Sequence, residues 1–227
     1  MAPPKTPRLR GQTALEYVMI IGGAILFVVI IVIILRSGIL RQGTQDIEEH
    51  ASDFQETYLT NYLVYENFDS GTSKKWTEKL CTWQATSGKY VSATGDCISI
   101  VQGYYDNFTL EFKVRRTGGA PNGEVGAIFR SDGTLANSYA VVLGNTDVRL
   151  LKDGGGVAQG LHGIPDINAI DTEVKVKAYS THFDVYVNGA KIFGVDDATH
   201  MSGRAGVLTK TPPVSVSGEY DYFRISR

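Results

Sequence analysis

Residues 172–194 read TEVKVKAYSTHFDVYVNGAKIFG, and this stretch has the clearest strand pattern of the chain. Apolar and polar side chains alternate over residues 172–179 and again over 182–187, which is the period of a strand with one buried face. Asn188-Gly189 is a dipeptide that two-residue hairpin turns favour. The stretch therefore predicts antiparallel strands joined by tight turns.

Strand patterns of the same kind recur along residues 62–227. The further predicted strands are Tyr90–Ser92, Cys97–Val101, Phe108–Arg115, Val125–Arg130, Tyr139–Leu143, Val148–Lys152, Lys191–Gly194, Ala205–Leu208 and Gly218–Ile225. Turn-forming pairs separate several of them, at Gly118-Gly119, Asn122-Gly123, Asp132-Gly133 and Asp153-Gly154. About ten to twelve short strands without a strong helical pattern predict an antiparallel β-sandwich.

The N-terminal part of the chain has a different composition. Its first ten residues include Lys5, Arg8 and Arg10 but no acid, and the nineteen residues 17–35 carry no charge. As a helix, residues 17–35 would be about 28 Å long, which matches the hydrocarbon core of a bilayer. The basic residues before this span predict a cytoplasmic N-terminus and an exported remainder.

Helical spacing continues beyond the apolar run. The apolar residues then form one stripe among polar neighbours, at Leu40, Ile47, Ala51, Phe54 and Tyr58. We therefore predict one helix over residues 12–61, transmembrane at 17–35, and a head domain over residues 62–227. The predicted fold class is α+β, with a long hydrophobic helix before the sandwich.

The start of the apolar run admits three interpretations. A secretory signal would have a shorter apolar core followed by small residues, which Arg36-Ser37-Gly38 fits poorly. A plain membrane anchor fits the length but leaves the residues from Gly11 to Tyr17 unexplained. A third class of signal is cut on the near side of the apolar run.

Gly11, Gln12, Glu16 and Tyr17 resemble the class III signal of archaeal type IV pilin-like proteins. The resemblance implies that a prepilin peptidase cuts between Gly11 and Gln12, so that residues 1–11 are a leader. It also implies that the apolar helix is kept as the core of a filament, which the chain forms by self-association after it leaves the membrane.

Glu16 has a physical role in this interpretation, because a carboxylate in lipid is costly unless it is paired. The resemblance makes it the fifth residue of the processed chain, where the terminal amine of a neighbouring subunit would be its partner. Alternatively, Glu16 lies at the membrane interface beside Tyr17. Gly22 and Gly23 would let neighbouring helices approach closely.

Two runs in the head resemble the concanavalin A-like, laminin G-like jelly roll. They are VYVNG-K-F within residues 185–193 and YDYFRIS at residues 220–226, and the resemblance covers about residues 62–227. It implies a lectin-like jelly roll. Proteins of this superfamily have many roles, so the fold does not decide the function.

Two covalent features are predicted for an exported head. Cys81 and Cys97 are the only cysteines, and they predict a disulfide, with two unrelated buried thiols as the alternative. Asn107-Phe108-Thr109 is a sequon that permits glycosylation if the domain lies outside the cell.

The sequence contains no recognisable catalytic machinery. Some jelly-roll enzymes carry a Glu-x-Asp-x-x-Glu strand; Glu219 and Asp221 match its first two acids, but residue 224 is arginine. The four histidines lack zinc-binding spacing, and Asp196-Asp197 is weighed as a calcium turn against a solvated acidic turn. We expect no enzyme activity, no metal site and no cofactor.

Carbohydrate binding is a better hypothesis, because exposed aromatic rings stack on sugars. The candidates are Tyr104, Tyr105, Tyr139, Tyr179 and Tyr220, although each ring could instead pack in the core. The formal net charge of -2, with no basic stripe, argues against nucleic acid.

The predicted function is therefore that of a pilin subunit in an archaeal surface filament, with a lectin-like head for adhesion to a carbohydrate or another surface ligand. The rivals are a non-polymerising, membrane-anchored carbohydrate-binding protein and a tethered glycan-processing enzyme.

Overall fold

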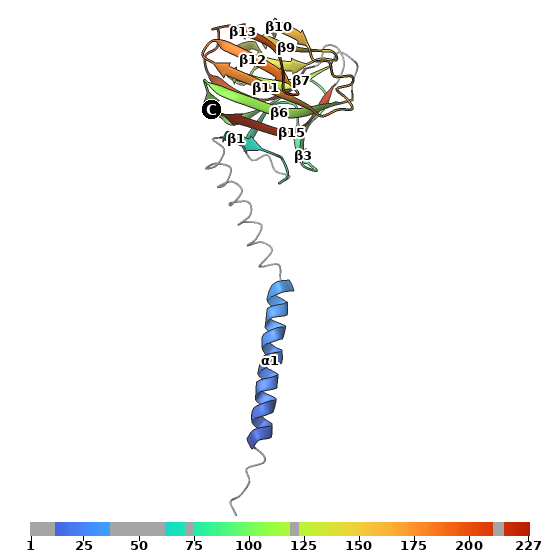
Figure 1. Ribbon diagram of the computed structural model, residues 1–227, viewed down its shortest axis with the longest axis vertical. Helices are drawn as coiled ribbons and strands as arrows, with labels where there is room; N and C mark the ends of the chain where they lie inside the picture. The colour runs from blue at the N-terminus through green and yellow to red at the C-terminus, as the bar shows by residue number, and fades with distance from the viewer. Residues whose placement is uncertain (1–11, 37–61, 71–74, 119–122, 211–215) are drawn as a thin grey trace, which may run out of the picture. The chain divides into compact units, whose positions relative to one another are not determined.

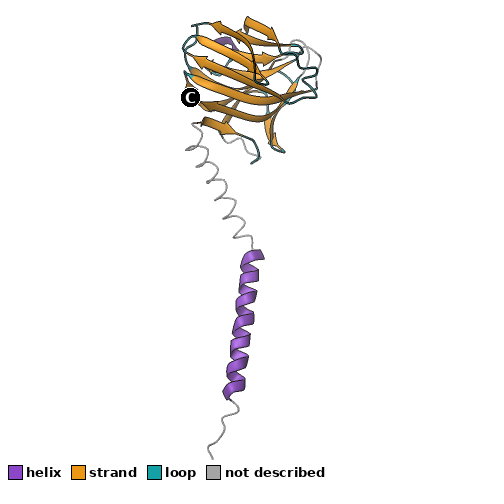
Figure 2. Ribbon diagram, viewed as in Figure 1, coloured by secondary structure: helices purple, strands orange, loops and turns teal. Residues whose placement is uncertain are grey.

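A computed structural model describes residues 12–36, 62–70, 75–118, 123–210 and 216–227, and within the helix it places the side chains of residues 17–30. The chain divides into two compact units, Met1–Gln55 and Glu56–Arg227. The first unit contains a helix, and the second contains strands joined by short loops (Figure 2).

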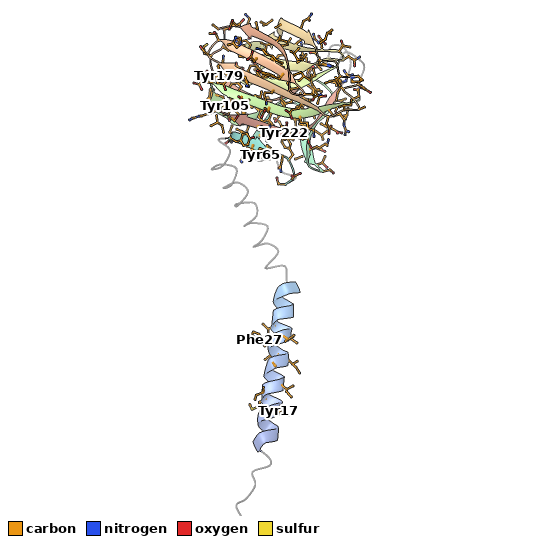
Figure 3. The ribbon with its side chains drawn as sticks, in the orientation of Figure 1. Tyr17, Phe27, Tyr65, Tyr105, Tyr179 and Tyr222 are labelled. Atoms are coloured by element: carbon orange, nitrogen blue, oxygen red, sulfur yellow. A yellow bond between two sulfur atoms is a disulfide. The ribbon has the colours of Figure 1, made fainter. Side chains whose placement is uncertain are left out.

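The helix α1 spans Gln12–Arg36. Its side chains from residue 17 to residue 30 are all exposed, as Tyr17 and Phe27 illustrate in Figure 3. Within the part of the chain that the structure describes, no helix is long and apolar enough to cross a membrane. The span predicted at residues 17–35 stays a prediction, and the helix predicted over 37–61 lies outside the described residues.

Two antiparallel sheets form the sandwich (Figure 1). The first has the order β13-β12-β11-β6-β15-β4-β3, with β1 also paired to β15, and the second has the order β10-β9-β8-β7-β14-β5-β2. The strands are β1 Tyr62–Glu66, β2 Trp76–Leu80, β3 Trp83–Thr86, β4 Lys89–Ser92, β5 Cys97–Tyr105, β6 Phe108–Thr117, β7 Glu124–Ser131, β8 Tyr139–Leu143, β9 Asp147–Lys152, β10 Gly155–Leu161, β11 Thr172–Tyr179, β12 His182–Val187, β13 Ala190–Asp196, β14 Gly203–Lys210 and β15 Ser217–Ser226. A short 3-10 helix, η1, lies at Leu135–Asn137.

Alternating side chains place the core between the two sheets. In β11, Val174, Val176 and Ala178 are buried, whereas the charged residues between them face outward. Phenylalanine, tyrosine and tryptophan rings from both sheets fill the interior, and Trp76 contacts Phe223 at a ring-centroid distance of 5.0 Å. The predicted antiparallel sandwich is confirmed.

Most strand predictions also agree with the structure. The bounds predicted for β8, β11 and β12 are those observed. Four strands were missed: β1, β2, β3 and β10. The missed strand β10 reads GGVAQGL, and its glycines give no strand-like pattern in the sequence. The strand forms by pairing with β9.

Two of the predicted turns have the backbone that tight hairpins need. Asn188 and Gly189 have φ values of 48° and 81°, and Asp153 and Gly154 have values of 51° and 81°. Positive φ at both central residues is the signature of a type I′ turn, which Asn-Gly and Asp-Gly adopt readily.

Cys81 and Cys97 form a disulfide, as predicted, with their Cα atoms 5.1 Å apart. Cys81 lies in the turn between β2 and β3, and Cys97 begins β5. Leu80 of β2 pairs with Ile98 of β5, so the bond joins these two neighbouring strands at the β2 edge of the second sheet.

Candidate functional site

Two adjoining hollows lie at one end of the sandwich. The larger hollow has a volume of about 550 Å³ and is lined by Tyr104, Tyr105, Asp106, Asn107, Ser180, Met201 and Ser202. The smaller hollow has a volume of about 230 Å³ and is lined by Thr77, Ile100, Val101, Gln102, Gly103, Tyr104 and Arg204. Tyr104 lines both, so its side chain stands at the boundary between them.

A β-bulge places Tyr104 at this boundary. Val101 of β5 pairs with Ala205 of β14 and Tyr105 pairs with Gly203, so three residues of β5 oppose Arg204 alone. A bulge of this kind redirects side chains and is common next to functional sites. The Tyr104 side chain is consequently 70% exposed, and the Arg204 guanidinium lies 5.6 Å from its ring centroid.

Gly103 is required for this bulge. Its φ is 124°, and a Cβ at this position would lie 2.6 Å from Cζ of the Tyr105 ring. That ring is buried, and its hydroxyl donates a hydrogen bond of 2.6 Å to the carbonyl of Gln102. Burial raises the pKa of Tyr105, so this hydroxyl stays neutral and anchors the bulge.

Arg130 joins two of the loops around the larger hollow. Its guanidinium is buried and donates through Nη2 to the carbonyl of Asp106 at 2.6 Å and through Nη1 to the carbonyl of His200 at 3.1 Å. The same group lies 5.0 Å from the ring centroid of Phe183. Burial lowers the pKa of Arg130, and the carbonyl bonds compensate for part of the lost hydration.

The loop between β11 and β12 is held by an amide side chain. The Oδ1 atom of Asn107 accepts a hydrogen bond of 2.6 Å from the backbone N–H of Ser180. Asn107 is exposed and belongs to the predicted sequon, so a glycan on its Nδ2 atom would lie at the larger hollow. Glycosylation at Asn107 and ligand binding in this hollow would therefore compete for the same space.

A second polar cluster orders the loop between β13 and β14. The Asp197 carboxylate accepts bonds from the hydroxyl of Tyr139 at 2.5 Å and from Nζ of Lys152 at 2.9 Å. Thr199 also donates to it, and these bonds together hold the pKa of Asp197 well below its usual range. The described residues contain no group of acids, histidines and cysteines suited to a metal ion.

The five candidate tyrosines separate into two groups. Tyr104 is exposed at the hollows, and Tyr179 is 48% exposed at the same end of the sandwich as Tyr105 (Figure 3). Tyr139 and Tyr220 are fully buried, so the prediction that their rings bind glycan is wrong. The hydroxyl of Tyr220 instead bonds the carbonyls of Gly126 and Leu208 within the core, and only the edge of Tyr105 reaches the larger hollow.

The two acids of β15 are held in ion pairs on the outer face of the first sheet. Glu219 accepts from Nη2 of Arg115 at 2.5 Å, and Asp221 pairs with Nζ of Lys113 at 2.9 Å. Arg224, at the position of the third acid, bonds Glu111 at 2.5 Å.

Sequence reasoning missed Arg130 and Arg204. Arg130 is the residue before the last of β7, where nothing in the sequence shows that its side chain is buried, and its partners come from distant loops. For Arg204, the available signal was Gly103 inside an otherwise β-rich run, because a glycine in a strand marks a bulge.

Comparison with known proteins supports the fold. No protein-family model and no curated protein matches the sequence. The carbohydrate-binding module CBM66 from Bacillus subtilis matches with a TM-score of 0.55 and 20% identity, over 63% of this chain and 91% of that one. A β-glucanase from Bacillus licheniformis matches with a TM-score of 0.57 and 14% identity, over 74% of this chain and 99% of that one.

The fold is a jelly roll. A protein of unknown function with a galectin-like fold, from Bacillus subtilis, agrees with this assignment at a TM-score of 0.59 and 12% identity, over 73% of this chain and 95% of that one. At these identities the likeness establishes the jelly-roll fold alone, and the function has to be argued from the hollows.

Proposed function

We propose that the head, residues 62–227, binds a saccharide at the two hollows and that the N-terminal helix displays this head on the cell surface. The exposed Tyr104 side chain between the hollows carries the proposal. An aromatic ring offers an apolar face to the C–H groups of a sugar. Around it, Asn107, Ser180 and Ser202 offer the donors and acceptors that sugar hydroxyls require.

The number and position of the acids argue for saccharide binding and against hydrolysis. Glycoside hydrolysis generally needs two carboxyl groups on either side of one glycosidic bond. Among the described residues that line the two hollows, Asp106 is the one acid. Glu219 and Asp221 are engaged by Arg115 and Lys113, which argues against their use as a catalytic pair. A tethered glycan-processing enzyme is therefore the weaker hypothesis.

Replacing Tyr104 with alanine tests the binding site. We expect Tyr104→Ala to raise the Kd for a saccharide about 10-fold, because the stacking surface is lost. Tyr104→Phe should stay within about 2-fold of the wild type, since the ring remains. Calorimetry with a saccharide first identified on a glycan array measures both.

Tyr186→Ala is the matched control, because Tyr186 lies on β12, whose outward residues face away from the core, and it lines neither hollow. Unchanged affinity in Tyr104→Ala, or an equal loss in Tyr186→Ala, would place the binding site elsewhere.

For the chain as a whole, we propose a pilin-like subunit of a surface filament. The sequence Gly11-Gln12 followed by Glu16 and Tyr17 motivates the proposal, together with the helix α1 over Gln12–Arg36 and its exposed apolar side chains. Prepilin peptidase would cut before Gln12, the span 17–35 would hold the subunit in the membrane, and association of helices would then bury these side chains. Gly22 and Gly23 favour close packing because they lack side chains, and the space that a Cβ would take on either is open for a neighbouring helix.

Charge and covalent chemistry support the proposed side of the membrane. Lys5, Arg8 and Arg10 favour a cytoplasmic N-terminus. The Cys81–Cys97 disulfide favours an oxidising location for the head. The alternative is a membrane-anchored carbohydrate-binding protein that does not polymerise.

Processing and assembly can be tested separately. N-terminal sequencing of the native protein should begin at Gln12, and a start at Met1 or Ala2 would contradict the pilin proposal. Glu16→Ala should leave membrane insertion and cleavage intact but abolish most filaments seen by electron microscopy, because the terminal amine of the neighbouring subunit loses its proposed partner. Glu16→Asp, which keeps the charge, should assemble better than Glu16→Ala. Normal filaments from Glu16→Ala would rule out the pairing.

A further inference from the structure

Arg204 differs from other arginines of the head in its partners. Arg115, Arg149 and Arg224 each form an ion pair with a carboxylate. Arg204 forms no ion pair with any carboxylate among the described residues, and its guanidinium lies over the Tyr104 ring. Its guanidinium is half-buried beside the smaller hollow. The cation therefore has hydrogen-bonding capacity available for a ligand.

The smaller hollow provides a polar but uncharged setting for this cation. Gln102 and Thr77 line it with an amide and a hydroxyl, and none of the described residues that line it is acidic. Asp106 is the acid of the larger hollow. Its main-chain carbonyl accepts a hydrogen bond of 2.6 Å from Nη2 of Arg130. Arg204 thus gives the smaller hollow a positive charge, whereas the larger hollow carries the acid Asp106.

We infer that the saccharide bound at this site is acidic, with its carboxylate or sulfate at Arg204 in the smaller hollow and its ring against Tyr104. A guanidinium presents paired N–H donors that match the oxygens of a carboxylate or sulfate. The Tyr104 ring, 5.6 Å from the Arg204 guanidinium carbon, restrains the cation before the ligand arrives. This inference rests on the proposed saccharide-binding function and specifies its ligand class.

The test compares acidic saccharides with neutral counterparts of the same shape. The whole chain, kept in detergent because the side chains of residues 17–30 are exposed and apolar, is screened on an array of neutral, carboxylated and sulfated oligosaccharides. Calorimetry then compares the best carboxylated glycan with its methyl ester, or the best sulfated glycan with its desulfated form. We expect the acidic form to bind about 10-fold more tightly, with affinity falling as salt is added.

Two variants connect this preference with Arg204. Arg204→Gln should remove the preference for the acidic form, so that the acidic and neutral forms bind this variant with affinities within about 2-fold of each other. Arg204→Lys, which keeps a point charge, should retain part of the preference. Thermal melting of both variants checks that the β5–β14 pairing survives.

Each outcome has a distinct meaning. If a neutral glycan binds as tightly as its acidic counterpart, or if Arg204→Gln keeps the preference, the inference is wrong while the saccharide-binding function stands. If the array is blank for every saccharide, the proposed function fails and the inference falls with it.

Discussion

Arg130→Met is expected to lower the free energy of unfolding of the head by about 3 kcal/mol, because buried carbonyls would lose their donors. The carbonyls of Asp106 and His200 both accept from the Arg130 guanidinium. Methionine fills a similar volume but donates nothing. Arg130 has a φ of 46°, and methionine would bear a comparable backbone cost there, so that cost largely cancels in the comparison.

The same variant should also weaken saccharide binding. Asp106 lines the larger hollow, and His200 lies next to Met201, another lining residue. We therefore expect Arg130→Met to raise the Kd by about 10-fold through loosening of the two loops, although Arg130 itself lines neither hollow. Arg130→Lys should be intermediate in both measurements, because it keeps the charge but loses the planar fork.

Arg115→Met is the matched control for Arg130→Met. Arg115 pairs with Glu219 on the outer face of the first sheet, so its replacement should cost less than about 1 kcal/mol. Urea denaturation followed by tryptophan fluorescence measures both variants. A loss below about 1 kcal/mol for Arg130→Met would contradict the role of Arg130 in joining the loops.

Removing the disulfide should produce a destabilisation of similar size. The Cys81→Ala, Cys97→Ala double variant is expected to lose about 3 kcal/mol, because the bond restricts a short loop in the unfolded chain. The cysteines are 16 residues apart, and the bond joins the end of β2 to the start of its neighbour β5 in the second sheet.

Reduction provides an independent control for the disulfide. Wild-type protein with a reducing agent should approach the stability of the double variant, and the double variant should not respond to the reducing agent. Saccharide affinity should change little in the folded variant, since neither cysteine lines a hollow. A reductant-insensitive wild type would contradict a stabilising role for the bond.

The sequence predicted the sandwich well where alternation was strong. β11 and β12 have regular apolar and polar positions, and their predicted ends match the structure. Alternation failed for β10, whose glycines give no pattern, and for the short strands at the β3 edge. These strands are held by pairing with neighbours that are visible only in the folded chain.

The site was harder to predict than the fold. Alternation of apolar and polar residues assigns side chains to the two faces of a strand, but it does not say which tyrosines face inward. Tyr104 and Tyr105 were given the same role, yet a bulge exposes the first and buries most of the second. Tyr220 points into the core of the sandwich, which its position in a strand could not reveal. The contact between Tyr104 and Arg204 joins residues 100 positions apart, so no local motif encodes it.

Nuclear magnetic resonance can locate the bound saccharide on the whole chain in detergent. We predict that the best array ligand shifts the backbone resonances of Tyr104, Asn107, Ser180, Ser202 and Arg204, while those of the outer face of the first sheet, such as Lys113 and Tyr186, stay in place. Shifts confined to that outer face, with the resonances around both hollows unchanged, would contradict a saccharide site at Tyr104.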